Sequence, residues 1–142
     1  GMTPDDFSRA AGFLKSEGIG VRAFVVVKPP FQDAALAVEG AVRSVAFALE
    51  SGADVVSLIP TRGGFGAMLA LERRGEFSEP DLELLEDCFD QSLRVAGALG
   101  RGLVFLDTWD LERFGASTGD PHWIPARRER LVAMNRSQRI LP

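Results

Sequence analysis

Two kinds of apolar pattern alternate along the chain. Short, nearly continuous apolar runs occupy positions 21–28, 54–59 and 103–106, and the first of them is rich in valine. A continuous apolar run of this length is typical of a strand that is buried on both faces, as in a parallel sheet. Between the runs, apolar residues recur every three or four positions, which predicts helices that pack one face against a core.

Capping residues and glycines mark where the predicted helices begin and end. Thr3, Asp33 and Ser78 suit helix N-termini, because their side-chain oxygens accept hydrogen bonds from free backbone N–H groups. Pro4 and Pro80 stand near the first helical positions, where proline is tolerated. Glycines after the apolar patterns predict the other ends. The predicted helices cover residues 4–17, 33–51, 67–74, 78–99 and about 125 onwards.

The order of these elements predicts the fold class. Strands that alternate with helices of this length form right-handed βαβ units, so we expect an α/β protein with a parallel sheet. Residues 1–110 would hold three parallel βα units, and residues 111–142 a loop followed by a basic C-terminal helix. A complete eight-stranded α/β barrel needs about 250 residues, so the 142 residues of this chain are too few for one.

The composition and two single residues further limit the class of protein to which this chain can belong. With 46% hydrophobic and 25% charged residues, the chain is expected to fold as one globular domain. Its apolar runs are far shorter than the ~20 residues that span a bilayer, and it opens with no signal-peptide pattern, so we expect no membrane contact. A chain with a single thiol is expected in the reducing cytoplasm. The single cysteine, Cys88, rules out an internal disulfide or a cysteine-based metal site in one chain, and is predicted as a core residue. The single histidine, His122, is predicted on a surface loop.

Charge is unevenly distributed. The net charge is −4, but residues 124–142 hold five arginines and one acid, which makes this segment +4 and the rest −8. One interpretation is a solvated amphipathic helix with Leu131 and Met134 turned inward. The other is a contact with RNA, although six charges fall short of a convincing nucleic-acid footprint.

Polar residues gather where the three predicted strands end. Lys28 follows the first strand, Arg62 lies in the glycine-rich loop 60–66 after the second, and Asp107 follows the third. Because parallel α/β sheets place ligands at the carboxyl ends of strands, Lys28 and Arg62 would hold an anionic group there. The structural alternative is that Lys28 reaches solvent and Asp107 caps a turn or pairs with an arginine.

Three further side chains near these strand ends are open to two interpretations. Asp107 with Asp110 is a candidate acid–base pair, although an aspartate in this position more often serves a turn. Trp109 and Trp123 are predicted to pack rather than to stack on a ligand.

Several motifs, taken in order, resemble a known enzyme family. They are Lys-Pro-Pro-Phe at the end of residues 18–31, the strand at residues 53–60, and residues 71–77 followed by Pro80. Together they resemble the second half of radical S-adenosylmethionine enzymes, and most closely the elongator-type group that includes the radical subunit of archaeosine synthase. The likeness covers roughly residues 3–110.

The resemblance implies a TIM-like, six-stranded partial (β/α)6 barrel, of which this chain would supply strands four to six. In that family a Cys-x3-Cys-x2-Cys loop in the first half holds a [4Fe–4S] cluster, which reduces S-adenosylmethionine to a radical. The loop is absent here, so the expected function is the C-terminal part of an Fe–S oxidoreductase, inactive alone. The resemblance implies an S-adenosylmethionine half-site formed by Lys28, Pro29, Ser57, Pro60 and Asp107. Arg62, at the same sheet edge, is expected to join these residues.

Half of a barrel has surface that a partner must cover. Its sheet would have two open edges, and its inner face would expose positions such as Phe24, Val26 and Ser57. We therefore expect a homodimer through the edges or the inner face, one that rebuilds a barrel-like sheet. Met2 would then be an internal methionine of a longer chain or the start of a genuine half-size protein.

Two other functions stay open at this point. The first is a stand-alone, non-catalytic α/β binding or interaction module that uses the rim formed by Lys28, Arg62 and Asp107. The second is a lyase that uses the amine of Lys28 as a nucleophile.

Overall fold

A three-stranded parallel sheet with the strand order β1-β2-β3 organises the chain. The structure is a computed structural model, and it describes residues 1–118 and 123–142. The strands are β1 (Arg22–Val27), β2 (Val55–Pro60) and β3 (Leu103–Leu106). This confirms the α/β class and the three strands predicted from the apolar runs.

Helices precede, connect and follow the strands. The side chains of Thr3 and Asp33 accept hydrogen bonds at the starts of the first two helices, as predicted. The prediction that Ser78 caps the helix before residue 99 is wrong. Its cap is Asp81, whose side chain accepts from the N–H of Leu84 at 2.8 Å. Ser78 lies outside the helix, and its hydroxyl contacts Lys28 instead. The helices are α1 (Pro4–Ser16), α2 (Ala34–Glu50), α3 (Gly66–Arg73), α4 (Leu82–Leu99), the 3₁₀ helix η1 (Leu111–Thr118) and α5 (Trp123–Ser137).

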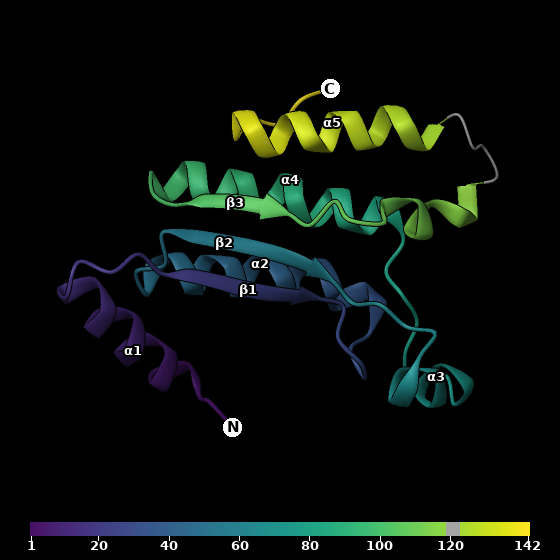
Figure 1. Cartoon of the computed structure of the whole chain (residues 1–142), viewed down its shortest axis with the longest axis horizontal. Coiled ribbons are helices and arrows are strands. Elements are labelled where there is room, and N and C mark those ends of the chain that lie inside the picture. Colours follow the sequence, from purple (N-terminus) through teal and green to yellow (C-terminus); the bar gives the residue numbers. More distant parts are fainter. Residues whose placement is uncertain (119–122) are drawn as a thin grey trace.

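Only one face of the sheet is covered by helices. Helices α2 and α4 both lie behind the strands in Figure 1, and no helix lies in front of them. Val25, Val56 and Leu106 point toward these helices and are buried in the core. On the other face, Phe24 is 66% and Val26 51% exposed. The expectation of strands buried on both faces is therefore wrong for β1, because within residues 1–118 and 123–142 no helix packs on the second face.

Two of the three side chains predicted to be exposed on the second sheet face are exposed. Phe24 and Val26 are exposed as predicted, and Leu103 is 45% exposed on the same face. Ser57, predicted to be exposed, is buried, because the strand register places it between Phe24 on β1 and Phe105 on β3. Two phenyl rings thus flank one small polar residue in the middle of the face.

Side-chain amides close the outer edge of β3. Gln138 accepts from the N–H of Val104 at 2.8 Å and donates to its carbonyl at 2.9 Å. Asn135 on α5 makes the same pair of bonds with Leu106, at 2.9 and 2.8 Å. These four bonds replace those that a fourth strand would make. The prediction of two open edges is therefore wrong at β3.

The outer edge of β1 stays open. In the part of the chain that the structure describes, β1 pairs with β2 alone, and the carbonyls of Val21 and Val27 accept hydrogen bonds from that side. Since alternate residues of a parallel strand bond to the same neighbour, the N–H groups of Arg22, Phe24 and Val26 point to the outer edge. The strand contains no proline and no bulge that would discourage a further strand from pairing there.

The C-terminal helix belongs to the same core as the sheet. Leu131 and Met134 of α5 are fully buried and join the core cluster, as the amphipathic interpretation predicts. Residues 111–142 thus pack on the first 110 residues within the part of the chain that the structure describes. No helix in that part is long and apolar enough to cross a membrane.

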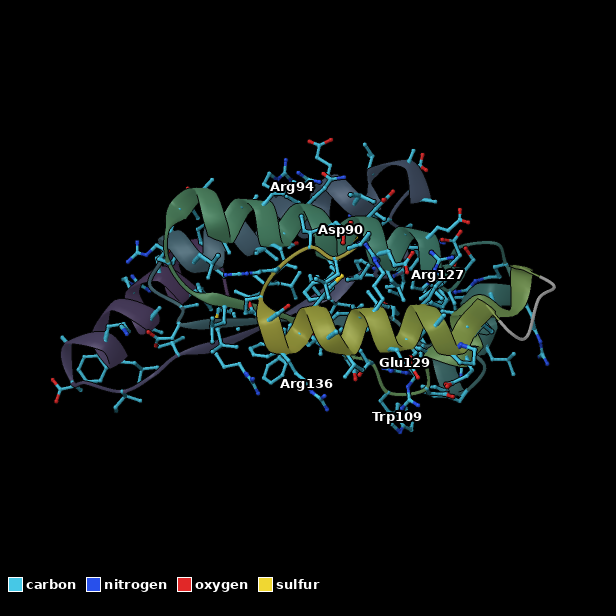
Figure 2. All side chains as sticks on the ribbon, turned by 90° about the horizontal axis from the view of Figure 1, so that it is seen from above. Asp90, Arg94, Trp109, Arg127, Glu129 and Arg136 are labelled. Atoms are coloured by element: carbon cyan, nitrogen blue, oxygen red, sulfur yellow. The ribbon has the colours of Figure 1, made fainter. Side chains whose placement is uncertain are left out.

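Part of the basic charge of α5 is neutralised within the chain. Arg127 pairs with Glu86, and Arg130 with Asp90 at 3.3 Å, both acids being on α4. Figure 2 shows Arg127 and Asp90 on the side where α5 faces α4, and Arg136 on the opposite side. These pairs fit the interpretation of α5 as a solvated amphipathic helix, and the contact with RNA stays a prediction.

Removing the amides that close β3 should destabilise the fold. In Asn135→Ala or Gln138→Ala, one N–H and one carbonyl of β3 lose their partners, which we expect to cost about 1–3 kcal/mol for each variant. Urea unfolding followed by circular dichroism measures the change. Arg136→Ala, on the exposed side of the same helix, is the control. Amide variants as stable as this control would show that the edge bonds contribute nothing.

Candidate functional site

Residues 78 and 79 connect two of the three strand ends and the helix after the third. The ammonium of Lys28, after β1, donates to the hydroxyl of Ser78 at 2.7 Å and to the carbonyl of Glu79 at 3.1 Å. The N–H of Gly63, after β2, donates to the Glu79 carboxylate at 2.5 Å. Arg113, in η1 after β3, donates to the same carboxylate oxygen at 2.7 Å. The segment that precedes α4 therefore joins the segments that follow the three strands at the carboxyl end of the sheet.

Glu79 is ionised because of these contacts. Burial opposes its ionisation, but hydrogen bonds from Arg113 and Gly63 and the charges of Arg113 and Arg62 outweigh it. They hold the pKa of the Glu79 carboxyl below its ordinary value of 4.5. Arg113 also donates to the carbonyl of Gly63 at 3.0 Å. Charge and hydrogen bonding thus fix the glycine-rich loop in one position.

Arg62 and Asp107, both predicted as site residues, meet each other. The guanidinium of Arg62 lies 3.1 Å from the Asp107 carboxylate and donates to the carbonyl of Trp109 at 2.7 Å. Its central carbon lies 4.8 Å from the ring centre of Trp109 and 5.6 Å from that of Phe114. Asp107 also accepts from the N–H of Trp109 at 3.0 Å. The structural interpretation of Asp107 is therefore confirmed: it pairs with an arginine and caps a turn.

Trp109 differs from its prediction as a packing residue. Its side chain is 68% exposed, and Figure 2 shows it projecting on the side of the molecule away from α4. The ring lies against the guanidinium of Arg62, and the next residue, Asp110, has a φ of 55°. This exposed ring stands at the carboxyl end of the uncovered sheet face. The side chain of Trp123, and His122, lie outside the described residues.

The six predicted site residues do not form one pocket. Arg62 and Asp107 lie together, whereas Ser57 lies on the uncovered face between two phenyl rings. Lys28 lines a separate cleft of about 710 Å³ between the β1–α2 and α3–α4 connections. Pro29 only continues the chain from Lys28, and Pro60 is buried at the end of β2. Neither Glu79 nor Arg113 is singled out as a site residue by the sequence, although the structure brings them together at the strand ends.

Neither Cys88 nor any acidic cluster offers a metal site in the part of the chain that the structure describes. Cys88 is fully buried in α4, and burial, with a smaller effect of Asp87, raises the pKa of its thiol to about 12. The prediction of a core residue is confirmed, and the thiol is not a nucleophile. Within residues 1–118 and 123–142 no three metal-binding side chains are grouped to hold an ion.

Comparison with known proteins gives no relative on which to base a function. No protein-family model, no curated protein and no solved structure matches this chain. The function must therefore be argued from the residues and the geometry.

Replacing Glu79 tests the arrangement at the strand ends. Because the pKa of Glu79 is lowered in the folded state, its ionisation stabilises the fold above pH 4.5 and ceases to do so as the pH falls through the folded-state pKa. We expect Glu79→Gln to lose about 1.5–3 kcal/mol of unfolding free energy at pH 7 and the loss to shrink toward pH 3. Glu76→Gln, whose carboxylate forms an exposed pair with Arg74, is the control. A loss that is equal at both pH values would rule out the charge of Glu79 as its cause.

Proposed function

We propose that this chain forms the C-terminal half of a radical S-adenosylmethionine-like oxidoreductase barrel. The observation that carries the proposal is the difference between the two edges of the sheet. The outer edge of β3 is closed by Asn135 and Gln138, whereas the outer edge of β1 is open. If these strands are numbers four to six of a partial barrel, strand four must pair with strand three and strand six ends the sheet, which is the pattern of open and closed edges found here.

The layers of the fold support the same proposal. The strands are parallel, their order in the sheet follows the chain, and α2 and α4 cover one face only (Figure 1). A barrel places its helices outside and its second sheet face inside, toward the other strands. The exposed face with Phe24 and Val26 would then line the interior, where the preceding strands would cover it.

The residues on that face fit only part of the chemistry of the family. Phe24, Phe105 and the exposed ring of Trp109 are suited to a purine ring, and Ser57 to its amino group or to a ribose hydroxyl. Arg62 is neutralised by Asp107. A [4Fe–4S] cluster does not fit this chain, because its one thiol, on Cys88, is buried and protonated. Radical initiation would have to come from the half that carries the cysteine loop.

Self-association of the chain follows from the same open edge. Two copies cannot rebuild a parallel barrel, because that would require β1 of one copy to pair with the closed edge of β3 in the other. They can pair β1 with β1 about a two-fold axis, which makes the two strands antiparallel and ends the assembly as a dimer. The homodimer therefore stays part of the proposal, but in a form that differs from the barrel-like sheet expected from the sequence.

Charge on the uncovered face should prevent this association. We expect the unaltered chain to sediment as a dimer at micromolar concentration, and Phe24→Lys and Val26→Lys to sediment as monomers. Phe13→Lys, at a similarly exposed ring on α1, is the control and should stay dimeric. An unaltered chain that is monomeric at this concentration would contradict the proposal that β1 needs a partner.

Calorimetry with S-adenosylmethionine tests the half-site. We expect weak binding, which Ser57→Val and Trp109→Ala reduce and Phe65→Ala, at an exposed ring on another loop, leaves unchanged. Binding that is lost in both site variants supports the half-site. A chain that dimerises through β1 but gives no heat with S-adenosylmethionine would be the non-catalytic interaction module instead, and the enzymatic proposal would fail.

A further inference from the structure

A second candidate site lies in the cleft beside Lys28, away from the uncovered sheet face. Its volume of about 710 Å³ is in the range of small-molecule sites, and its walls are the β1–α2 and α3–α4 connections. Phe31 on one wall and Phe77 on the other supply apolar surface, and the first residues of α2 line the cleft between them. The N–H of Phe31 donates to the carbonyl of Glu76 at 3.0 Å, which joins the two walls.

The ammonium of Lys28 is buried without a counter-charge. The residue is only 8% exposed, and both hydrogen-bond partners of its Nζ, Ser78 and the carbonyl of Glu79, are neutral. Among the residues that the structure describes, no carboxylate forms an ion pair with it. A buried charge is costly unless an opposite charge compensates it. An ammonium carries three N–H donors, so one donor and the whole positive charge remain for a group in the cleft.

The backbone around Lys28 is held in an unusual conformation. Lys28 has a φ of 53° and Phe31 a φ of 67°, both in the left-handed region that residues with a Cβ rarely adopt. Both residues line the cleft. Such strain persists only where the surrounding contacts enforce it, and it is concentrated at ligand-binding loops. Here it directs the Lys28 side chain toward Ser78 and the cleft.

The acidic residues at the cleft restrict the charge of a ligand. Asp33 accepts from the N–H of Ala35 at 2.9 Å, Glu72 from the N–H of Gly64 at 3.1 Å, and Glu76 pairs with Arg74. Each carboxylate thus has a donor of its own, and none of the three is a hydrogen-bond partner of Lys28. Three fixed negative charges nevertheless repel a multiply charged anion, so the cleft favours a ligand with a single negative charge.

We propose that this cleft binds a small organic monocarboxylate. The carboxylate accepts a hydrogen bond from the ammonium of Lys28, and the dipole at the start of α2 also favours a negative charge in the cleft. An apolar or aromatic body rests on Phe31 and Phe77. This site goes beyond the proposed function, since it needs neither the uncovered face nor a second half of a barrel.

Titration with benzoate, followed in ¹H–¹⁵N NMR spectra, tests this site on the whole chain. We expect saturable shifts confined to residues 28–35 and 72–78. Lys28→Met should weaken binding roughly tenfold or more, and Lys28→Arg less, because the charge is kept. Phe31→Ala should weaken benzoate but not acetate, since that ring is exposed and contacts only the body of the ligand, while Phe65→Ala should change neither.

Three results would overturn the proposal. The first is the absence of saturable shifts with benzoate at millimolar concentration. The second is an unchanged affinity in a Lys28→Met variant whose spectrum shows that it is folded. The third is stronger binding of inorganic phosphate than of benzoate, which would assign the cleft to a different class of anion. The Phe31→Ala variant alters only an exposed ring, so its affinity for benzoate can still be compared with the expected loss if Lys28→Met does not fold.

Discussion

The unequal edges of the sheet are the constraint on which the rest of the structure depends. A strand at the edge of a sheet has N–H and carbonyl groups that need a partner. At β3 these groups are bonded by Asn135 and Gln138, which fixes α5 beside the sheet. At β1 nothing in the described chain fills this role, and the face that carries Phe24 has no cover either. The sheet therefore has one edge whose backbone groups are bonded, at β3, and one whose backbone groups lack a partner in the described residues, at β1.

The second organising contact is the carboxylate of Glu79. It joins the loop after β2 to the helix after β3, while the backbone carbonyl of the same residue holds Lys28 after β1. Polar groups that appear available in the sequence, such as Arg62 and Asp107, are thereby used inside the protein. The surfaces that remain for a ligand are the uncovered face with Trp109 at its end and the cleft beside Lys28.

Much of the fold could be predicted from the sequence, because it depends on local patterns. Runs of aliphatic residues predicted the three strands, and Thr3 and Asp33 predicted two helix starts. The closure of β3 could not be predicted, because Asn135 and Gln138 look like surface residues of a basic helix until the helix is placed beside a strand. The start of α4 was misplaced for a similar reason: only the tertiary contact with Lys28 shows why Ser78 lies outside the helix.

The candidate site was predicted less completely than the fold. The pairing of Asp107 with an arginine was foreseen as the structural alternative, but Glu79 and Arg113 have no motif that would single them out. Burial of Ser57 depends on the register between strands, which no local pattern encodes. The proposed relation to radical S-adenosylmethionine barrels rests on short motifs and on the open edge of β1 together.

Hydrogen exchange of individual backbone amides tests most directly whether one edge is closed and the other open. In the monomeric Phe24→Lys variant, we expect the amides of Val104 and Leu106 to be protected and those of Arg22 and Val26 to exchange rapidly. In the associated unaltered chain, the amides of β1 should become protected as well. Rapid exchange at Val104 and Leu106, or protection of the β1 amides already in the monomer, would contradict the unequal edges and the barrel half inferred from them.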